Sequence, residues 1–309
     1  MELLTSLYPF ARWEQASDMA AAVCRMDELG LYALAIPEHV VVPDGPIGDS
    51  IGGTWPEAIV LGSYFAGMTE RLRFTYYAMV LPYRNPVLLA KQISTFDYLS
   101  GGRTEFVFGA GWFEDEFNAL GVPFDRRGER TDDALAAMRA LWTSDGPVTH
   151  QGPFVQFEDV IFDPKPAQKP SPPIWIGGSG RRPHQRVVEH GDGWAPMIGD
   201  AASIAPEVAR IRADVASAGR NPDELAFMFN MQIGSGDAAV REAFSHVETE
   251  DLQEEQATSE GSRADELISS LSEYADAGIT HMMVVFDWES PSDYMTKLEW
   301  LAKEIVPHV

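Results

Sequence analysis

The sequence predicts an α/β protein built as a TIM (β/α)8 barrel. Short runs of β-branched and aromatic residues alternate with longer stretches of helical period, and about eight such pairs follow one another along 309 residues. We therefore expect a single domain over residues 1–309, with eight parallel strands inside a ring of helices. An open, doubly wound parallel sheet is the structural alternative, because it is built from the same alternation.

The predicted strands are short and apolar, and most are bounded by Gly, Pro or Asp. In chain order they cover residues 3–8, 31–36, 72–81, 105–108, 174–176, 193–196, 226–233 and 280–286. The stretches between them have the amphipathic period of helices, and several begin at proline or end at glycine. These predicted helices cover residues 14–29, 56–68, 86–99, 114–120, 131–142, 183–190, 206–218, 265–277 and 291–305.

Two segments interrupt the alternation. Residues 148–162, VTHQGPFVQFEDVIF, alternate in polarity around Gly152-Pro153, which predicts an inserted β-hairpin. Residues 237–261 are acidic and weakly apolar, and they follow the seventh predicted strand as a long βα loop. This loop is either a lid over the barrel or a solvated loop with no role.

Composition excludes several classes of partner. A formal net charge of -24 argues against nucleic acid and anionic membranes, because both repel an acidic surface. Cys24 is the only cysteine, which excludes an intramolecular disulfide and a cysteine-based metal cluster, and the scattered histidines predict no metal site. Without a signal-peptide pattern or an apolar run of about 20 residues, the expected protein is soluble and cytoplasmic.

The residues at the carboxyl ends of the predicted strands are polar, aromatic or glycine. Glu38-His39 follow the second strand, Gly109 and Trp112 the fourth, and Trp194 ends the sixth. In barrels of this kind the chemistry lies at these ends. The sequence therefore predicts a functional site along this rim.

His39 allows two interpretations. It is either a core residue with a satisfied hydrogen bond or a group that transfers a proton, since histidine titrates near neutral pH. Neighbouring strand residues point to opposite faces, so Glu38 is expected to form an outward salt bridge.

Residues 172–183 read PPIWIGGSGRRP, an apolar strand that runs into four small residues, Gly177-Gly178-Ser179-Gly180. Such a loop lets backbone N–H groups approach an anion, the following helix adds its positive end, and Arg181 adds charge. The alternative is a plain tight turn. A Walker loop, a dinucleotide fingerprint and a nucleophile elbow do not match the spacing, whereas paired carboxylates for glycoside hydrolysis remain open.

The order of motifs in residues 80–135 resembles the luciferase-like monooxygenase superfamily, in its coenzyme F420-dependent oxidoreductase branch. The motifs are P-x-R-N-P, A-K-Q, D-x-L-S-G-G-R, G-x-G-W, E-F and G-V, followed by PKP at 164–166, PPIWIGG and GDGW at 191–194. Each motif is weak, and their order is specific.

The resemblance implies a barrel that binds F420, or alternatively FMN, at the carboxyl rim. It assigns the cofactor phosphate to Gly177, Gly178, Ser179 and Gly180. It places Glu38 and His39 near the reactive ring, and a bulge or non-proline cis peptide within Tyr76-Tyr77-Ala78-Met79 behind that ring, with Tyr77 and Ala78 expected to bind the cofactor. Trp112 and Trp194 are expected to wall the pocket beside Gly109, and a homodimer is the family's usual assembly.

The function that follows is hydride transfer between F420 and a small organic substrate, with His39 as the catalytic residue. An FMN-dependent monooxygenase using reduced flavin and O2 is the first alternative. A non-catalytic F420- or flavin-binding protein is the second, and a metal-free barrel hydrolase is a more distant one. In the F420-dependent glucose-6-phosphate dehydrogenase branch a glutamate follows the fourth-strand glycines, but here Trp112 and Phe113 stand there, which argues against a sugar phosphate.

Overall fold

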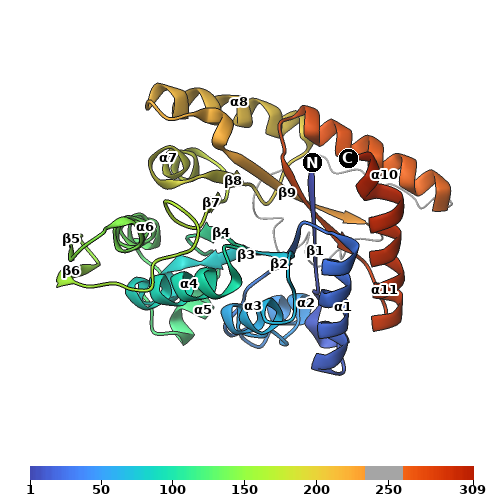
Figure 1. Ribbon diagram of the computed structural model, residues 1–309, viewed down its shortest axis with the longest axis horizontal. Helices are drawn as coiled ribbons and strands as arrows, with labels where there is room; N and C mark the ends of the chain where they lie inside the picture. The colour runs from blue at the N-terminus through green and yellow to red at the C-terminus, as the bar shows by residue number, and fades with distance from the viewer. Residues whose placement is uncertain (234–259) are drawn as a thin grey trace.

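The computed structural model describes residues 1–233 and 260–309 (Figure 1). Within these residues, parallel strands close into a barrel in the order β1-β10-β9-β8-β7-β4-β3-β2. Closure confirms the TIM-barrel prediction and excludes the open sheet. The helices surround the barrel, and the β5–β6 hairpin projects beside α6 (Figure 1).

The elements follow the predicted alternation. The barrel strands are β1 (Glu2–Ser6), β2 (Ala33–Ile36), β3 (Arg73–Val80), β4 (Thr104–Gly109), β7 (Ile174–Gly177), β8 (Gly193–Ala195), β9 (Ala226–Ile233) and β10 (His281–Phe286). The helices are α1 (Ala16–Leu29), α2 (Pro46–Ile51), α3 (Ala58–Ala66), α4 (Pro86–Ser100), α5 (Glu114–Ala119), α6 (Arg127–Thr143), α7 (Arg181–His190), α8 (Ala201–Ser217), α10 (Glu260–Asp276) and α11 (Pro291–Trp300). Short 3-10 turns cover Phe10–Arg12, Leu81–Tyr83, Pro222–Glu224 and Val306–His308, and a π turn covers Leu301–Ile305.

Four helices, α6, α7, α8 and α10, begin earlier than predicted, and α2 was not predicted. The side chain of Asp200 accepts a hydrogen bond from the Ser203 amide in a reciprocal capping box, so α8 begins five residues before Pro206. Gly180 caps α7, which places Pro183 inside the first turn, where a missing N–H costs nothing. Proline therefore did not mark the first residue of either helix: Pro183 lies in the first turn of α7, and Pro206 lies inside α8, beyond its first turn.

The barrel separates two apolar cores. The inner one receives residues from every barrel strand: Leu4, Ala33, Ala35, Tyr77, Val107, Trp175, Ala195, Met228 and Met283. The outer core lies between the strands and the helices and contains most of the buried leucine, isoleucine and phenylalanine. Large side chains such as Trp175 face alanines across the interior, so the barrel is filled and the site must lie at an end.

The inserted hairpin is present as predicted, with β5 (Val148–Gln151) paired antiparallel to β6 (Gln156–Val160). Asp133 of α6 anchors it by accepting hydrogen bonds from the amides of Phe154 and Val155, at 2.7 and 2.8 Å. The predicted long loop at 237–261 falls almost wholly outside the described residues. No helix among the described residues is long and apolar enough to cross a bilayer.

Candidate active site

His39 lies at the carboxyl rim of the barrel, three residues beyond the end of β2. Its Nδ1 is 3.0 Å from Oε2 of Glu116, and its side chain keeps 15% of its surface exposed. Edges and faces of aromatic rings surround the imidazole, with ring centroids 4.8 Å away at Trp55, 6.4 Å at Trp112 and 6.3 Å at Phe113. His39 thus has one satisfied ring nitrogen and a partly accessible ring, which suits proton transfer.

Glu116 is the buried partner of this histidine. Its carboxylate also accepts hydrogen bonds from the Val40 and Val41 amides, at 2.5 and 3.2 Å, and from the Tyr83 hydroxyl at 2.8 Å. Burial alone would raise the pKa of the Glu116 carboxyl, but its interactions with His39, Val40 and Tyr83 outweigh burial and hold that pKa below its usual value. A charged, acceptor-only group therefore lies beneath His39.

Glu116 was not among the site residues predicted from the sequence. It stands third in a run of acidic residues, Glu114-Asp115-Glu116, where composition does not separate the three. In the structure Glu114 and Asp115 are exposed while Glu116 is fully buried. The available signal was the adjacent Phe117, also fully buried, which marks the inward face of α5.

Glu38 supports the same loop from below. It is buried, and its carboxylate accepts a 3.0 Å hydrogen bond from the Val80 amide and forms an ion pair with Arg84. Burial raises the pKa of the Glu38 carboxyl, an effect that Arg84 and Val80 oppose. The expected salt bridge is present, but it points into the structure, because Arg84 follows β3 and reaches under the rim.

The third strand carries the expected irregularity. The Tyr77–Ala78 peptide is cis, and the pairing of β3 with β4 shifts between Tyr77 and Met79. The Tyr77 side chain is buried, with its hydroxyl 3.0 Å from the Pro196 carbonyl oxygen and 2.9 Å from Asn230 Oδ1. Tyr77 therefore fills the barrel below the rim, and the small Ala78 occupies the position next to β7.

Small residues of neighbouring strands form a shallow floor at the rim. A Cβ on Gly177 would lie 3.8 Å from the Cβ of Ala78 and 3.4 Å from Cγ1 of Val107. Gly109 ends β4 beside them and has only the Gly111 amide within 4 Å of its missing side chain. Larger residues here would fill the space, so the floor fits a flat ring lying on the backbone.

The loop after β7 is partly committed to the fold. The Gly178 amide donates to the Ala195 carbonyl at 3.2 Å, so it is not free for an anion. The remaining candidates are Ser179, Gly180 and Arg181, where the first amides of α7 have no partner within the helix. Gly178 and Gly180 have φ values of 101° and 92°, which glycine adopts without strain.

Trp194 lies behind this loop. It is 1% exposed, and its Nε1 donates to the Gly178 carbonyl at 2.7 Å. The sequence had suggested that Trp194 walls the pocket; buried behind the loop, it instead holds the loop in place. Trp112 does reach the rim, stacked on Phe113 with centroids 5.1 Å apart.

Tyr8 and Trp55 complete the aromatic wall. They stack with centroids 5.1 Å apart, and Trp55 touches the His39 ring. Neither residue was predicted from the sequence, because aromatic residues in loops carry no periodic pattern that distinguishes a pocket wall from the core.

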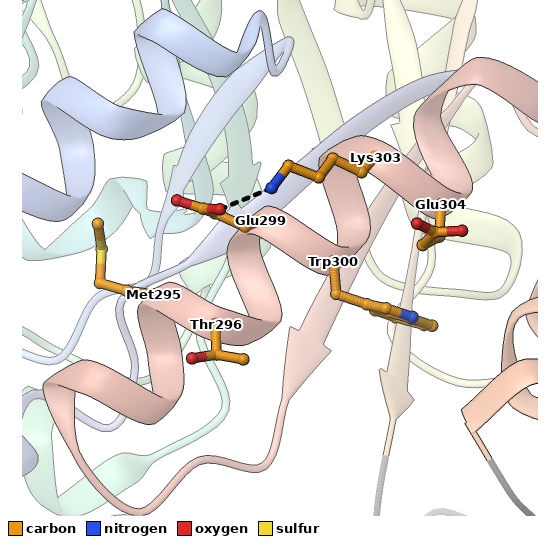
Figure 2. Close-up of a pocket in the computed structure, with 6 residues that line it drawn as sticks. All are labelled: Met295, Thr296, Glu299, Trp300, Lys303 and Glu304. Carbon is orange, nitrogen blue, oxygen red and sulfur yellow. Dashed lines mark hydrogen bonds and ion pairs between the residues drawn. The ribbon is translucent and has the colours of Figure 1, made fainter.

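Elsewhere the described residues offer less. They contain no group of three or more His, Cys, Asp or Glu side chains placed to hold a metal ion. A surface hollow on α11 and the π turn is lined by Met295, Thr296, Glu299, Trp300, Lys303 and Glu304 (Figure 2). Its Glu299–Lys303 ion pair of 2.8 Å is an ordinary exposed i,i+4 pair, which indicates a solvated helix face.

Curated relatives are similar in sequence to part of the chain. An FMNH(2)-dependent dimethylsulfone monooxygenase of Pseudomonas putida is 32% identical over 166 residues, which cover 53% of this chain and 45% of that one. An uncharacterized protein of Mycobacterium tuberculosis is 34% identical over 189 residues, covering 57% and 66%. The chain thus matches under half of the first relative's length and just under two thirds of the second's.

Solved structures share the whole fold at low identity. Monooxygenase RslO1 from Streptomyces bottropensis superposes with a TM-score of 0.78 at 20% identity, covering 100% of this chain and 99% of that one. An F420-dependent secondary alcohol dehydrogenase in complex with an F420-acetone adduct also gives 0.78, at 17% identity and 98% coverage of both chains. These likenesses concern the fold.

The sequence pattern described as luciferase-like monooxygenase matches residues 5–283, which is most of the chain. The protein belongs to the luciferase-like monooxygenase family.

Proposed function

We propose that the protein transfers a hydride between coenzyme F420 and a small organic substrate, with His39 moving the accompanying proton. One observation supports this above others: the same rim carries a half-buried histidine held by a buried carboxylate and a floor of small residues, Ala78, Gly109 and Gly177. A proton-transfer group beside a flat, backbone-lined surface is what hydride chemistry on a planar cofactor requires.

The chain's own residues divide this work. Ser179, Gly180 and Arg181, around the start of α7, offer the backbone amides that would hold the phosphate. Trp112, with Trp55, would exclude water from the side of His39. The bound deazaflavin supplies the hydride-accepting or hydride-donating carbon, and the protein supplies orientation and the proton.

An FMN-dependent monooxygenase using reduced flavin and O2 is the second candidate. The specific observation in its favour is the 32% identity to an FMNH(2)-dependent enzyme. The floor and the phosphate loop fit either ring, so binding must separate the two.

Titration of the purified protein with F420 and, separately, with FMN tests the proposal. Fluorescence in one buffer gives both dissociation constants. A preference for F420 of tenfold or more, about 1.4 kcal/mol, supports the deazaflavin function. A preference for FMN supports the monooxygenase, and binding of neither overturns both.

Gly178→Ala tests the loop itself. Its φ of 101° is one that an L side chain adopts only with strain of about 1–3 kcal/mol, so the loop should shift and weaken binding of whichever cofactor is used. Gly30→Ala is the matched control, because Gly30 has a φ of 76° at the end of α1 and open space around its missing side chain. Equal cofactor affinity in the two variants would remove the loop from the site.

We also propose a homodimer formed through the outer faces of α3 and α4. Arg84 and Glu57, at the starts of these two helices, are 3.0 Å apart, so the helices run side by side. Large apolar side chains are exposed along both: Val60, Tyr64, Leu88, Tyr98 and Leu99. On a chain of net charge -24, a face formed mainly by apolar side chains is where two copies repel each other least.

Sedimentation velocity of the wild type and of a Val60→Glu, Leu88→Glu double variant checks this interface. We expect a dimer for the wild type and a monomer for the variant, because each dimer would bury four new carboxylates. A wild-type monomer, or a variant dimer, would contradict it.

A further inference from the structure

The Glu116 carboxylate is confined to accepting hydrogen bonds. Its side chain is 1% exposed, three donors converge on it, namely the Val40 and Val41 amides and the Tyr83 hydroxyl, and Nδ1 of His39 lies 3.0 Å away. An ionised carboxylate has no proton to give. The His39 nitrogen that faces it, Nδ1, must therefore carry the proton.

From this contact we propose that Glu116 is a positioning residue that selects the Nδ1–H tautomer of His39. The neutral ring then presents Nε2 as its only lone pair, on the side away from Glu116. This inference rests on the proposed function for its reaction. It goes beyond that function by naming the atom that moves the proton and the group that makes it available.

The proton-transfer step follows directly. When a substrate alcohol is oxidised, its O–H bond breaks and the proton bonds to the Nε2 lone pair. The electron pair left on oxygen forms the C=O bond as the hydride of the adjacent C–H bond leaves; the bound deazaflavin would take up that hydride. The ring becomes an imidazolium whose Nδ1–H still faces the negative Glu116 at 3.0 Å. Reduction of a carbonyl runs the same proton in the opposite direction, from Nε2 to oxygen.

Glu116 also fixes the loop that carries His39, and the two roles must be separated. Its bonds to Val40 and Val41 hold the backbone after His39, whereas its bond to Nδ1 acts on the ring. A glutamine separates them. The amide oxygen can still accept from the backbone, but the NH2 group presents a donor to Nδ1 and forces the neutral ring to carry its proton on Nε2.

The test is 15N NMR of protein labelled at histidine, without cofactor, in alkaline buffer where the rings are neutral. The signals of His39 are identified among the seven histidines by their loss in His39→Gln. We expect a protonated Nδ1 and an unprotonated Nε2 in the wild type, and the reverse in Glu116→Gln. A wild-type ring protonated on Nε2 overturns the proposal even if the variant does not fold.

Steady-state kinetics provide the second measurement. Glu116→Gln should lower kcat about 10²-fold or more, with KM changed little, since the lone pair is lost but the pocket is kept. Tyr83→Phe is the control, because it removes one donor from Glu116 and leaves the Nδ1 contact; its His39 should keep the wild-type tautomer. An inverted tautomer with unchanged kcat overturns the positioning role.

Failure of the proposed function has a different signature. A protein that binds neither F420 nor FMN overturns the hydride-transfer proposal through titration alone. The tautomer is read from spectra of the protein without cofactor, so the two failures are distinguishable.

Discussion

The two ends of the barrel each carry a buried glutamate near a histidine, and they differ in what the histidine can reach. At the carboxyl rim, Glu116 contacts Nδ1 of His39, whose ring is partly exposed among aromatic side chains. At the amino end, Glu105 accepts from Arg73 at 2.7 Å and Tyr32 at 2.5 Å, and His281 lies against the Tyr32 ring.

The amino-end cluster is closed by its neighbours. His281 packs between Tyr32 and Trp175, and its Nδ1 is 2.7 Å from the Thr280 hydroxyl. Burial lowers the pKa of His281 to about 4, so the ring is neutral at neutral pH. Similar residue types therefore stabilise the fold at the amino end of the barrel and provide a reactive group at the carboxyl end. Strand direction decides this, because the βα loops that form active sites lie at the carboxyl ends of the strands.

Removal of the rim histidine should produce the largest effect. We expect His39→Ala to reduce turnover about 10²–10⁴-fold, the usual contribution of a general acid or base, while cofactor affinity and unfolding free energy stay near wild type. Turnover and cofactor titration check this together. Unchanged turnover would remove His39 from the mechanism.

The amino-end histidine should instead affect stability with pH. Its pKa is about 4 when folded and about 6.5 when unfolded, so the unfolded chain binds more protons between these values. Its contribution is fully present above pH 6.5 and declines towards pH 4, by about 3 kcal/mol.

Urea unfolding of the wild type and His281→Phe across pH 4–7 measures that contribution. The phenylalanine keeps a ring against Tyr32 and Trp175 and cannot titrate. The wild type should lose more unfolding free energy than the variant as the pH falls. Parallel curves would show that His281 is not held neutral.

Loss of the amino-end carboxylate should have a smaller effect. Glu105→Gln removes the negative charge that faces Arg73 at 2.7 Å. This should cost about 2 kcal/mol, below the 3–5 kcal/mol of fully buried pairs, because a quarter of the Arg73 side chain is exposed. Urea unfolding at pH 7 gives the difference, and turnover at saturating cofactor should match the wild type. Reduced turnover in folded protein would contradict a purely structural role for the amino-end cluster.

The sequence predicted the barrel because strand and helix periods depend on local pattern, and burial on both faces makes barrel strands apolar throughout. It predicted the rim residues that directly follow strands, such as His39 and Gly177, because strand direction fixes their end of the barrel. Glu116, Trp55 and the buried position of Trp194 were beyond it. Their orientations follow from packing between loops distant in sequence, which no local pattern encodes.

The rim is assembled from side chains that cross between neighbouring βα units. Arg84, after β3, joins Glu38 beyond β2 to Glu57, which caps α3, and Glu116 of α5 holds the amides that follow His39. The βα loops are consequently not interchangeable parts. A loop grafted from another barrel after β2 would bring only half of each contact, so redesign of substrate preference should move the β2, β3 and β4 loops as one unit.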